Sequence, residues 1–178
     1  LPFDEPTTKH CGSCTACIDI CPTQAIVEPY MLDARKCIAY LTIEYKGIIP
    51  EELRRGIGNR VFGCDDCQLI CPWNSFAKKA TIEDFNPRHG LDQINLLDLW
   101  YWDEATFLAN TEGSPIRRTG YQSFMRNIAI GLGNAPFSDE IIETLKQSRE
   151  LHDEIVQVHI DWAIQEQVAK SNQGLNLL

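Results

Sequence analysis

The sequence predicts an α+β, mostly helical protein in two parts, a cysteine-rich region followed by a helical one. All eight cysteines fall between residues 11 and 71 of the 178-residue chain. From residue 94 to residue 170, apolar side chains recur at the spacing of amphipathic helices. No apolar run reaches the roughly 18 residues of a membrane span, so we expect no membrane segment. We therefore expect one domain over residues 1–85 and an α-helical region over residues 86–178.

The first cysteine run, CGSCTACIDICP at residues 11–22, has the spacing C-x2-C-x2-C-x3-C-P. This spacing is typical of bacterial ferredoxins, in which three close cysteines hold one [4Fe–4S] cluster and the fourth ligates the other cluster. Short gaps let a tight loop wrap three corners of a cube, and Pro22 ends the turn by fixing φ. A disulfide scaffold belongs to secreted chains, and no secretion signal is visible. Zinc usually takes two well-separated cysteine pairs, so iron is favoured.

The second run, GCDDCQLICPWN, repeats only the last three cysteines of this pattern, and Val61 stands where the first is expected. Cys37 is the one cysteine left to replace it, so eight thiolates serve two clusters. Cluster one would take Cys11, Cys14, Cys17 and Cys71, and cluster two would take Cys21, Cys37, Cys64 and Cys67. The sequence thus predicts a ferredoxin-like domain with two [4Fe–4S] clusters. Such clusters need a reducing compartment, which indicates the cytoplasm.

The segment between the two runs is longer than the short hairpin of a plain two-cluster ferredoxin. After a turn near Pro29, DARKCIAYLTIEYKG is expected to form a helix with Asp33 as N-cap and Gly47 as the C-terminal stop. Pro50 is expected to start a second helix. We predict a helical insert that also donates a cluster ligand.

The second half reads as short amphipathic helices joined by polar turns. The stretches GYQSFMRNIAIGLGN, SDEIIETLKQS and EIVQVHIDWAIQEQ each carry an apolar stripe, and Ser138 is expected to cap the second. We expect a helical repeat or a small bundle. His159 lies on an apolar stripe and is interpreted as a packed core histidine.

A net charge of −9 argues against a general nucleic-acid binder, but basic residues gather locally at Arg117, Arg118 and Arg126. The default interpretation of this group is a solvated face. Pro115 can open a helix, which would place Arg117 and Arg118 in its first turn, where positive side chains oppose the helix dipole. This local cost leaves a phosphate-contact role open.

Several stretches together resemble the C-terminal half of the epoxyqueuosine reductases, a cobalamin-dependent family of tRNA queuosine synthesis. The resemblance rests on CGSCTACIDICPTQAI, CIAYLTIEYKG, GNRVFGCDDCQLICPWN and GSPIRRTGYQSFMRNIAIGLGN. It implies that electrons pass through two clusters to a cobalamin, which reduces epoxyqueuosine to queuosine at the tRNA wobble position. It also implies that an N-terminal domain, expected to be absent from this chain, holds much of the cobalamin and supplies the proton donor. The resemblance therefore assigns no catalytic residue to this chain, and the fragment alone is expected to be inactive.

The resemblance also implies site residues and partners. The C-terminal helices would form a HEAT-like repeat that helps to bind tRNA, with Arg117 and Arg118 on phosphates. Expected partners are a tRNA carrying epoxyqueuosine and a low-potential electron donor, and the protein is expected to be a monomer. The residues expected to face the cobalamin are Ala39, Tyr40, Thr42, Glu44, Arg60, Val61, Phe62 and Gly63.

Three other functions compete with this interpretation. A stand-alone ferredoxin-type electron carrier explains the cysteines but neither the insert nor the helical second half. Another cobalamin-dependent reductase, such as a reductive dehalogenase, would share the cluster domain, but the helical region and its arginines favour tRNA. A binding module with structural clusters would have redox-inactive iron.

Overall fold

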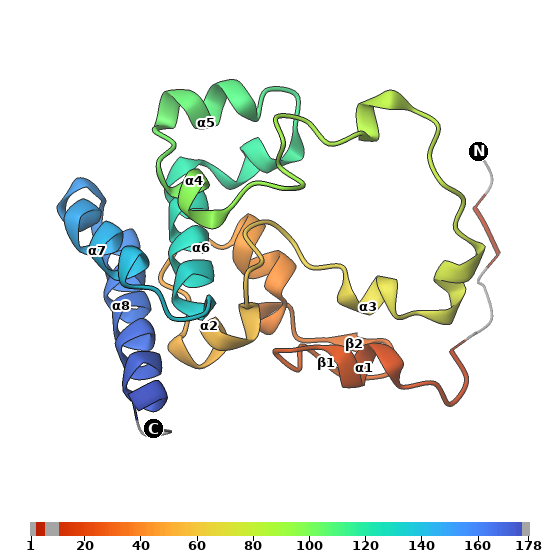
Figure 1. Ribbon diagram of the computed structural model, residues 1–178. Helices are drawn as coiled ribbons and strands as arrows, with labels where there is room; N and C mark the ends of the chain where they lie inside the picture. The colour runs from red at the N-terminus through yellow and green to blue at the C-terminus, as the bar shows by residue number, and fades with distance from the viewer. Residues whose placement is uncertain (1–2, 6–10, 176–178) are drawn as a thin grey trace.

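The computed structural model describes residues 3–5 and 11–175, with side chains described as far as residue 172. Within these residues the chain is mostly helical, as predicted, and has one two-stranded antiparallel sheet. The elements in chain order are α1 (Ala16–Ile20), β1 (Ile26–Glu28), β2 (Met31–Leu32), the 3-10 helix η1 (Ala34–Lys36), the π-helix η2 (Tyr40–Glu44), α2 (Glu51–Ile57), α3 (Asp66–Leu69), the 3-10 helices η3 (Pro72–Phe76) and η4 (Glu83–Phe85), α4 (Leu96–Trp100), α5 (Glu104–Asn110), the 3-10 helix η5 (Pro115–Thr119), α6 (Tyr121–Asn134), α7 (Asp139–Ser148), the 3-10 helix η6 (Arg149–Leu151) and α8 (Glu154–Leu175). In Figure 1 the sheet, α1 and α3 lie on one side of the molecule and α6 to α8 on the other, with the insert between them.

The two cysteine runs fold in the same way, as their spacing predicts. Thr15 before α1 has φ −116° and ψ 6°, and Asp65 before α3 has φ −114° and ψ 12°. The cysteines before the two prolines also match, since Cys21 has φ −66° and ψ 111° and Cys71 has φ −65° and ψ 126°. α1 and α3 pack against each other (Figure 1). The second run therefore repeats the first in backbone geometry, with Val61 at the place of Cys11.

The insert differs from the expected single helix. Asp33 does cap η1, because its side chain accepts a hydrogen bond from the Arg35 amide at 3.1 Å. At Cys37, however, the backbone turns extended (φ −69°, ψ 123°) and interrupts the helix before η2. The prediction of Gly47 as the stop is also wrong, since the helical part ends at Tyr45, where the backbone again becomes extended. At Gly47 a Cβ atom would lie 2.8 Å from the Tyr45 hydroxyl oxygen, so this position lacks room for a side chain.

The second half contains the three amphipathic helices that the sequence predicts, as α6, α7 and α8. α7 begins after Ser138, whose side chain accepts a hydrogen bond from the Ile141 amide at 3.4 Å. α6 lies in the middle and packs along α8. Their backbones approach closely at Gly133, where an added Cβ would lie 2.9 Å from Ala163 Cα. Pro115 opens the short 3-10 helix η5, not a longer helix, and Gly120 (φ 75°) separates it from α6.

One hydrophobic core joins the insert to the C-terminal helices. Ile38, Leu41, Ile49 and Ile57 of the insert are buried in the same cluster as the apolar side chains of α6 and α8. The insert therefore packs as part of the helical half, and the cysteine loops extend from it. The domain boundary between residues 85 and 86 and the HEAT-like character of the helices remain predictions.

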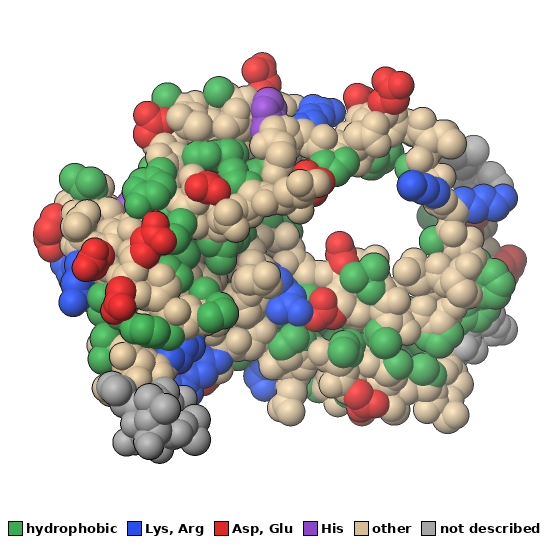
Figure 2. All heavy atoms as spheres, in the orientation of Figure 1, with side chains coloured by type: hydrophobic (Ala, Val, Ile, Leu, Met, Phe, Trp, Pro, Cys, Tyr) green, Lys and Arg blue, Asp and Glu red, His purple; other side chains and the backbone are tan. Residues whose placement is uncertain are grey.

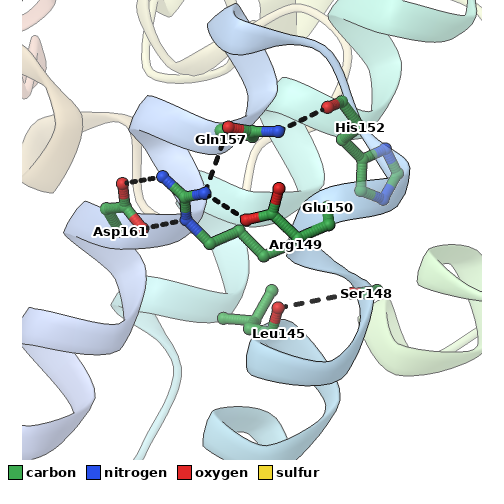
Figure 3. Close-up of polar contacts among 7 residues, drawn as sticks. All are labelled: Leu145, Ser148, Arg149, Glu150, His152, Gln157 and Asp161. Atoms are coloured by element: carbon green, nitrogen blue, oxygen red, sulfur yellow. Dashed lines mark hydrogen bonds and ion pairs between the residues drawn. The ribbon is translucent and has the colours of Figure 1, made fainter.

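Arg149 links the end of α7 to α8 through hydrogen bonds at the corner between the two helices (Figure 3). Arg149 donates from Nε and Nη2 to both carboxylate oxygens of Asp161, at 2.7 and 2.8 Å. Its Nη1 donates to Glu150 and Gln157, and the Gln157 amide donates in turn to His152 O at 2.8 Å. Bidentate geometry fixes the guanidinium plane, so these contacts set the angle at which α8 leaves the corner.

The segment between η3 and α4 is open and carries only η4. Figure 2 shows an opening through the molecule that this segment bounds on one side. Large apolar side chains along and just before the segment are exposed, namely Leu69, Ile70, Trp73, Phe76, Ile82 and Phe85.

Among residues 3–5 and 11–175, no helix combines the length and the apolar character that crossing a membrane requires.

Candidate metal centre

Most of the cysteines surround one cavity of about 310 Å³. Much of the rest of its wall is apolar and comes from the sheet and from the start of the insert, including Ile26, Leu32 and Ile38. The cysteines that line the cavity are Cys17, Cys21, Cys37, Cys64 and Cys67. The structure thus brings together all four predicted ligands of cluster two, and all eight cysteines are free of disulfide bonds.

Cys37 reaches this cavity because of the break in the insert. Its extended backbone lies between η1 and η2, and Ile38 begins the next helical segment. A continuous helix would have carried Cys37 on a regular face beside Leu41. The interruption that the helical pattern did not predict therefore places the lone cysteine beside the second run.

The electrostatics of the thiols fit a strongly positive occupant. Burial raises the pKa of Cys64, and it raises the pKa of Cys67 together with the nearby charges of Cys64 and Cys37. For Cys21, burial alone would raise the pKa, but hydrogen bonds from backbone amides, led by Ala25, outweigh it and lower the pKa. The Ala25 amide lies 3.2 Å from Cys21 Sγ. Several thiolates this close together are stable only beside a cationic group, which an iron–sulfur core provides.

The number of cysteines around the cavity indicates a cluster more than a single ion. Within the described residues, no three His, Cys, Asp or Glu side chains converge closely enough to hold one metal ion. Thiolates at the corners of a cube stand farther apart than the four ligands of a tetrahedral zinc site. Five cysteines line the cavity, one more than a tetrahedral zinc site uses, so the donor set fits a multi-iron core.

Of the predicted ligands of cluster one, Cys17 also lines this cavity, whereas Cys11, Cys14 and Cys71 lie outside it. Cys11 and Cys14 are exposed and belong to a tight turn, in which the Cys14 amide donates to Cys11 O at 3.1 Å. The Cys11 amide donates to the Tyr30 hydroxyl at 3.3 Å, which ties the turn to the sheet. Cys71 lies at the start of η3. Their assignment to cluster one remains a prediction.

The two segments expected to face the cobalamin lie side by side. Thr42 is fully buried, and its hydroxyl donates to Ile38 O at 2.7 Å and accepts from the Gly63 amide at 3.0 Å. The Asn127 amide group donates to Thr42 O and to Val61 O, both at 2.8 Å. These bonds join η2 to residues 60–63, immediately before Cys64.

The predicted cobalamin residues differ in accessibility. Tyr40 and Glu44 are exposed, whereas Ala39, Arg60, Val61, Phe62 and Gly63 are half-buried. Thr42 has no exposed surface, so its side chain lies behind the surface that the others form. Arg60 pairs with Asp66 at 2.5 Å, which anchors it to α3. Contact of these residues with cobalamin remains a prediction.

The sequence missed the residues that organise these segments. Arg126, expected on a solvated face, is fully buried and donates to Leu41 O, Tyr45 O and Gly47 O at 2.7 to 2.9 Å. Burial lowers the pKa of Arg126 to about 10. Helical periodicity could not identify its role, because α6 is buried on all sides from Ser123 to Gly133.

The arginine turn lies next to the same segment. Arg117 and Arg118 are both exposed, as a phosphate contact requires. Arg118 Nη2 lies 2.7 Å from Glu44 Oε1, so the residues predicted to contact tRNA and cobalamin meet here. η5 and η2 also pack against each other.

Comparison with known proteins supports the metal centre. Residues 10–74 match the family described as "4Fe-4S double cluster binding domain". This match confirms the expectation of [4Fe–4S] clusters in this region.

The curated relatives share one name. The chain is 58% identical to epoxyqueuosine reductase of Xanthomonas campestris over 92% of its own length and 46% of the relative's length. It is 55% identical to epoxyqueuosine reductase of Escherichia coli over 97% of its own length and 45% of the relative's. The chain spans about half the length of the curated relatives it matches.

Solved structures agree with this relationship. Epoxyqueuosine reductase from Streptococcus thermophilus matches 98% of this chain and 46% of its own with a TM-score of 0.81 at 26% identity. An epoxyqueuosine reductase solved with an epoxyqueuosine-modified tRNA stem loop matches 92% of this chain and 52% of its own, with a TM-score of 0.71 at 28% identity. By sequence and by fold, the chain is a relative of the C-terminal portion of epoxyqueuosine reductase.

Proposed function

We propose that this chain is the electron-transfer and RNA-facing portion of an epoxyqueuosine reductase. In this function two [4Fe–4S] clusters pass electrons to a cobalamin, and epoxyqueuosine at the tRNA wobble position is reduced to queuosine. The observation that carries the proposal is the arrangement of the cysteines, in which Cys37 joins two matched loops around one cavity. Relatives that are 58% and 55% identical over nearly the whole chain bear the name of that activity.

The chain's own residues would hold the clusters and set their surroundings. Cluster one would be held by Cys11, Cys14, Cys17 and Cys71, and cluster two by Cys21, Cys37, Cys64 and Cys67. The clusters supply single electrons at low potential when bound. The Ala25 amide, which donates to Cys21 Sγ, would stabilise the reduced form, because hydrogen bonds to sulfur spread its negative charge.

The surface beside the cysteine cavity would face the cobalamin. The hydrogen bond between Thr42 and Gly63 joins η2 to residues 60–63, and Cys64 follows directly. A cofactor that receives electrons from cluster two must lie close to such a surface. Tyr40 and Glu44 would contribute exposed side chains and Phe62 a half-buried one, while Thr42 and Asn127 would hold the backbone in place.

The helical half would bind the tRNA. Arg117 and Arg118 are exposed on η5, next to the proposed cobalamin surface, so phosphates of the anticodon region could be held while the wobble base approaches the cofactor. In this scheme α6 to α8 would serve as the HEAT-like element. Because such clusters need a reducing compartment, the protein would act in the cytoplasm. It would work as a monomer and receive its electrons from a low-potential donor.

The experiment that tests the proposal is mass spectrometry of tRNA nucleosides from cells that lack the parent gene. Epoxyqueuosine should accumulate, queuosine should disappear, and the intact gene should reverse both changes. A gene whose Cys37 codon is replaced by that of alanine should fail to reverse them. Unchanged queuosine, in cells with no second enzyme for this step, would refute the activity and leave a two-cluster electron-transfer module.

A further inference from the structure

One lysine joins the arginine turn to the proposed cobalamin segment. Lys46 Nζ lies 2.6 Å from Thr119 O, 3.4 Å from Arg118 O and 3.0 Å from Ile43 O. An ammonium group has three N–H donors, and here each has a carbonyl acceptor. The acceptors come from two segments far apart in the sequence, so Lys46 bridges them.

The turn needs such a partner. η5 is only five residues long, and the last carbonyls of a helix have no N–H donor within the helix itself. A positive group near the C-terminal end of a helix is favourable, because the dipole is negative there. Arg117 and Arg118 already lie in the last turn of η5, and Lys46 adds a positive group from outside the turn that donates directly to its last carbonyls.

The other end of the bridge is rigid. Residues on both sides of Lys46 are held by Arg126, which donates to Tyr45 O at 2.8 Å and to Gly47 O at 2.9 Å. The ion pair between Arg118 and Glu44 spans the same junction, but its side chains are 68% and 43% exposed. Exposed pairs contribute little to stability. Lys46 is exposed as well, but its hydrogen bond to Thr119 O is partly buried and its ammonium has three carbonyl acceptors, so it contributes more to the junction than this pair.

We propose that Lys46 is a positioning residue for tRNA binding, which holds the Arg117–Arg118 turn at a fixed place relative to Tyr40–Glu44. One anticodon loop then contacts the arginine turn through its phosphates and the cobalamin surface at the same time. This inference rests on the proposed function, because it takes the arginine turn to face the RNA.

The test uses the full-length protein with both clusters and cobalamin. Its substrate is an anticodon stem loop that carries epoxyqueuosine. Lys46→Met should raise KM about tenfold, equivalent to about 1.4 kcal/mol, and change kcat by less than about twofold. Lys46→Arg should restore most of the loss, since a guanidinium can also donate to the carbonyls. Lys79→Met removes the same charge from an exposed position between η3 and α4, outside the proposed binding surfaces, and should leave KM unchanged.

A second background shows whether Lys46 acts through the turn. When Arg117 and Arg118 are both replaced by alanine, Lys46→Met should have no further effect on KM. A KM for Lys46→Met within twofold of the wild type would overturn the inference and leave the proposed function intact, and so would a lower kcat at unchanged KM. Wild-type protein that neither binds nor reduces the stem loop would instead refute the proposed function.

Discussion

Replacing Arg126 with methionine tests how the proposed cobalamin segment is held. The guanidinium donates from Nη2 to Leu41 O at 2.7 Å, and from Nη1 to Tyr45 O at 2.8 Å and Gly47 O at 2.9 Å. Its remaining partner is the Asn127 amide oxygen, at 2.9 and 3.1 Å. Within the described residues no carboxylate pairs with this charge, which agrees with the pKa of about 10 that burial gives Arg126.

The magnitude follows from two opposing terms. Each buried carbonyl left without a donor costs about 1–3 kcal/mol, so three carbonyls give about 3–9 kcal/mol. Removing the charge recovers the cost of burying it, which is several kcal/mol. Methionine fills much of the vacated volume and adds favourable packing. We therefore expect Arg126→Met to lower the free energy of unfolding by about 3 kcal/mol.

Urea denaturation, followed by far-ultraviolet circular dichroism at equal iron content, measures this change. Arg126→Lys should lose less, because an ammonium can still donate to some of the carbonyls. Arg55→Met is the matched control, since its guanidinium is 75% exposed and pairs with Glu166 at 2.8 Å; it should lose less than about 1 kcal/mol. A loss below about 1 kcal/mol for Arg126→Met would refute the reasoning and show that desolvation cancels the hydrogen bonds.

Three further changes test other parts of the structure. Cys37→Ala should remove cluster two and roughly half of the bound iron, measured by iron analysis and electron paramagnetic resonance; intact iron content would contradict the ligand assignment. Burial lowers the pKa of His159 from 6.5 to about 4. As the pH falls below 6.5, His159 therefore takes up a proton in the unfolded chain before it does so in the folded protein. Stability should therefore drop by up to about 1.4 kcal/mol per pH unit below pH 6.5, and urea titrations at pH 6.5 and 5.5 should show a smaller drop in His159→Gln. Gly133→Ala should lower the free energy of unfolding by about 1–3 kcal/mol, because a Cβ would lie 2.7 Å from Trp162 Cζ3 and 2.9 Å from Ala163 Cα. Gly131→Ala would meet only the movable end of Leu96 at 2.8 Å, so thermal melts should show a smaller shift, and equal shifts would contradict the packing argument.

The sequence alone predicted the features that depend on neighbours along the chain. The cysteine spacing predicted two matched loops, because a loop that wraps a cube needs its ligands at fixed short intervals. The three long helices of the second half followed from apolar periodicity, and the Ser138 cap followed from its place before α7. His159 was correctly interpreted as a core residue, since its Nε2 accepts from the Ile49 amide at 3.2 Å inside the core.

Tertiary structure decided what each polar group contacts. Helical periodicity gave no reason for the break at Cys37, where the backbone is extended, while Ile38 and Leu41 just after it pack in one core with the second half. Arg126 looked like a member of a basic surface group, and only folding shows that its partners are carbonyls of residues 41–47. Nothing in the sequence indicated the role of Lys46, since its acceptors, the carbonyls of Arg118 and Thr119, come from a distant turn. Ligand spacing and helix period are local properties of the chain, whereas the partner of a buried carbonyl is set by which distant segment folding brings beside it.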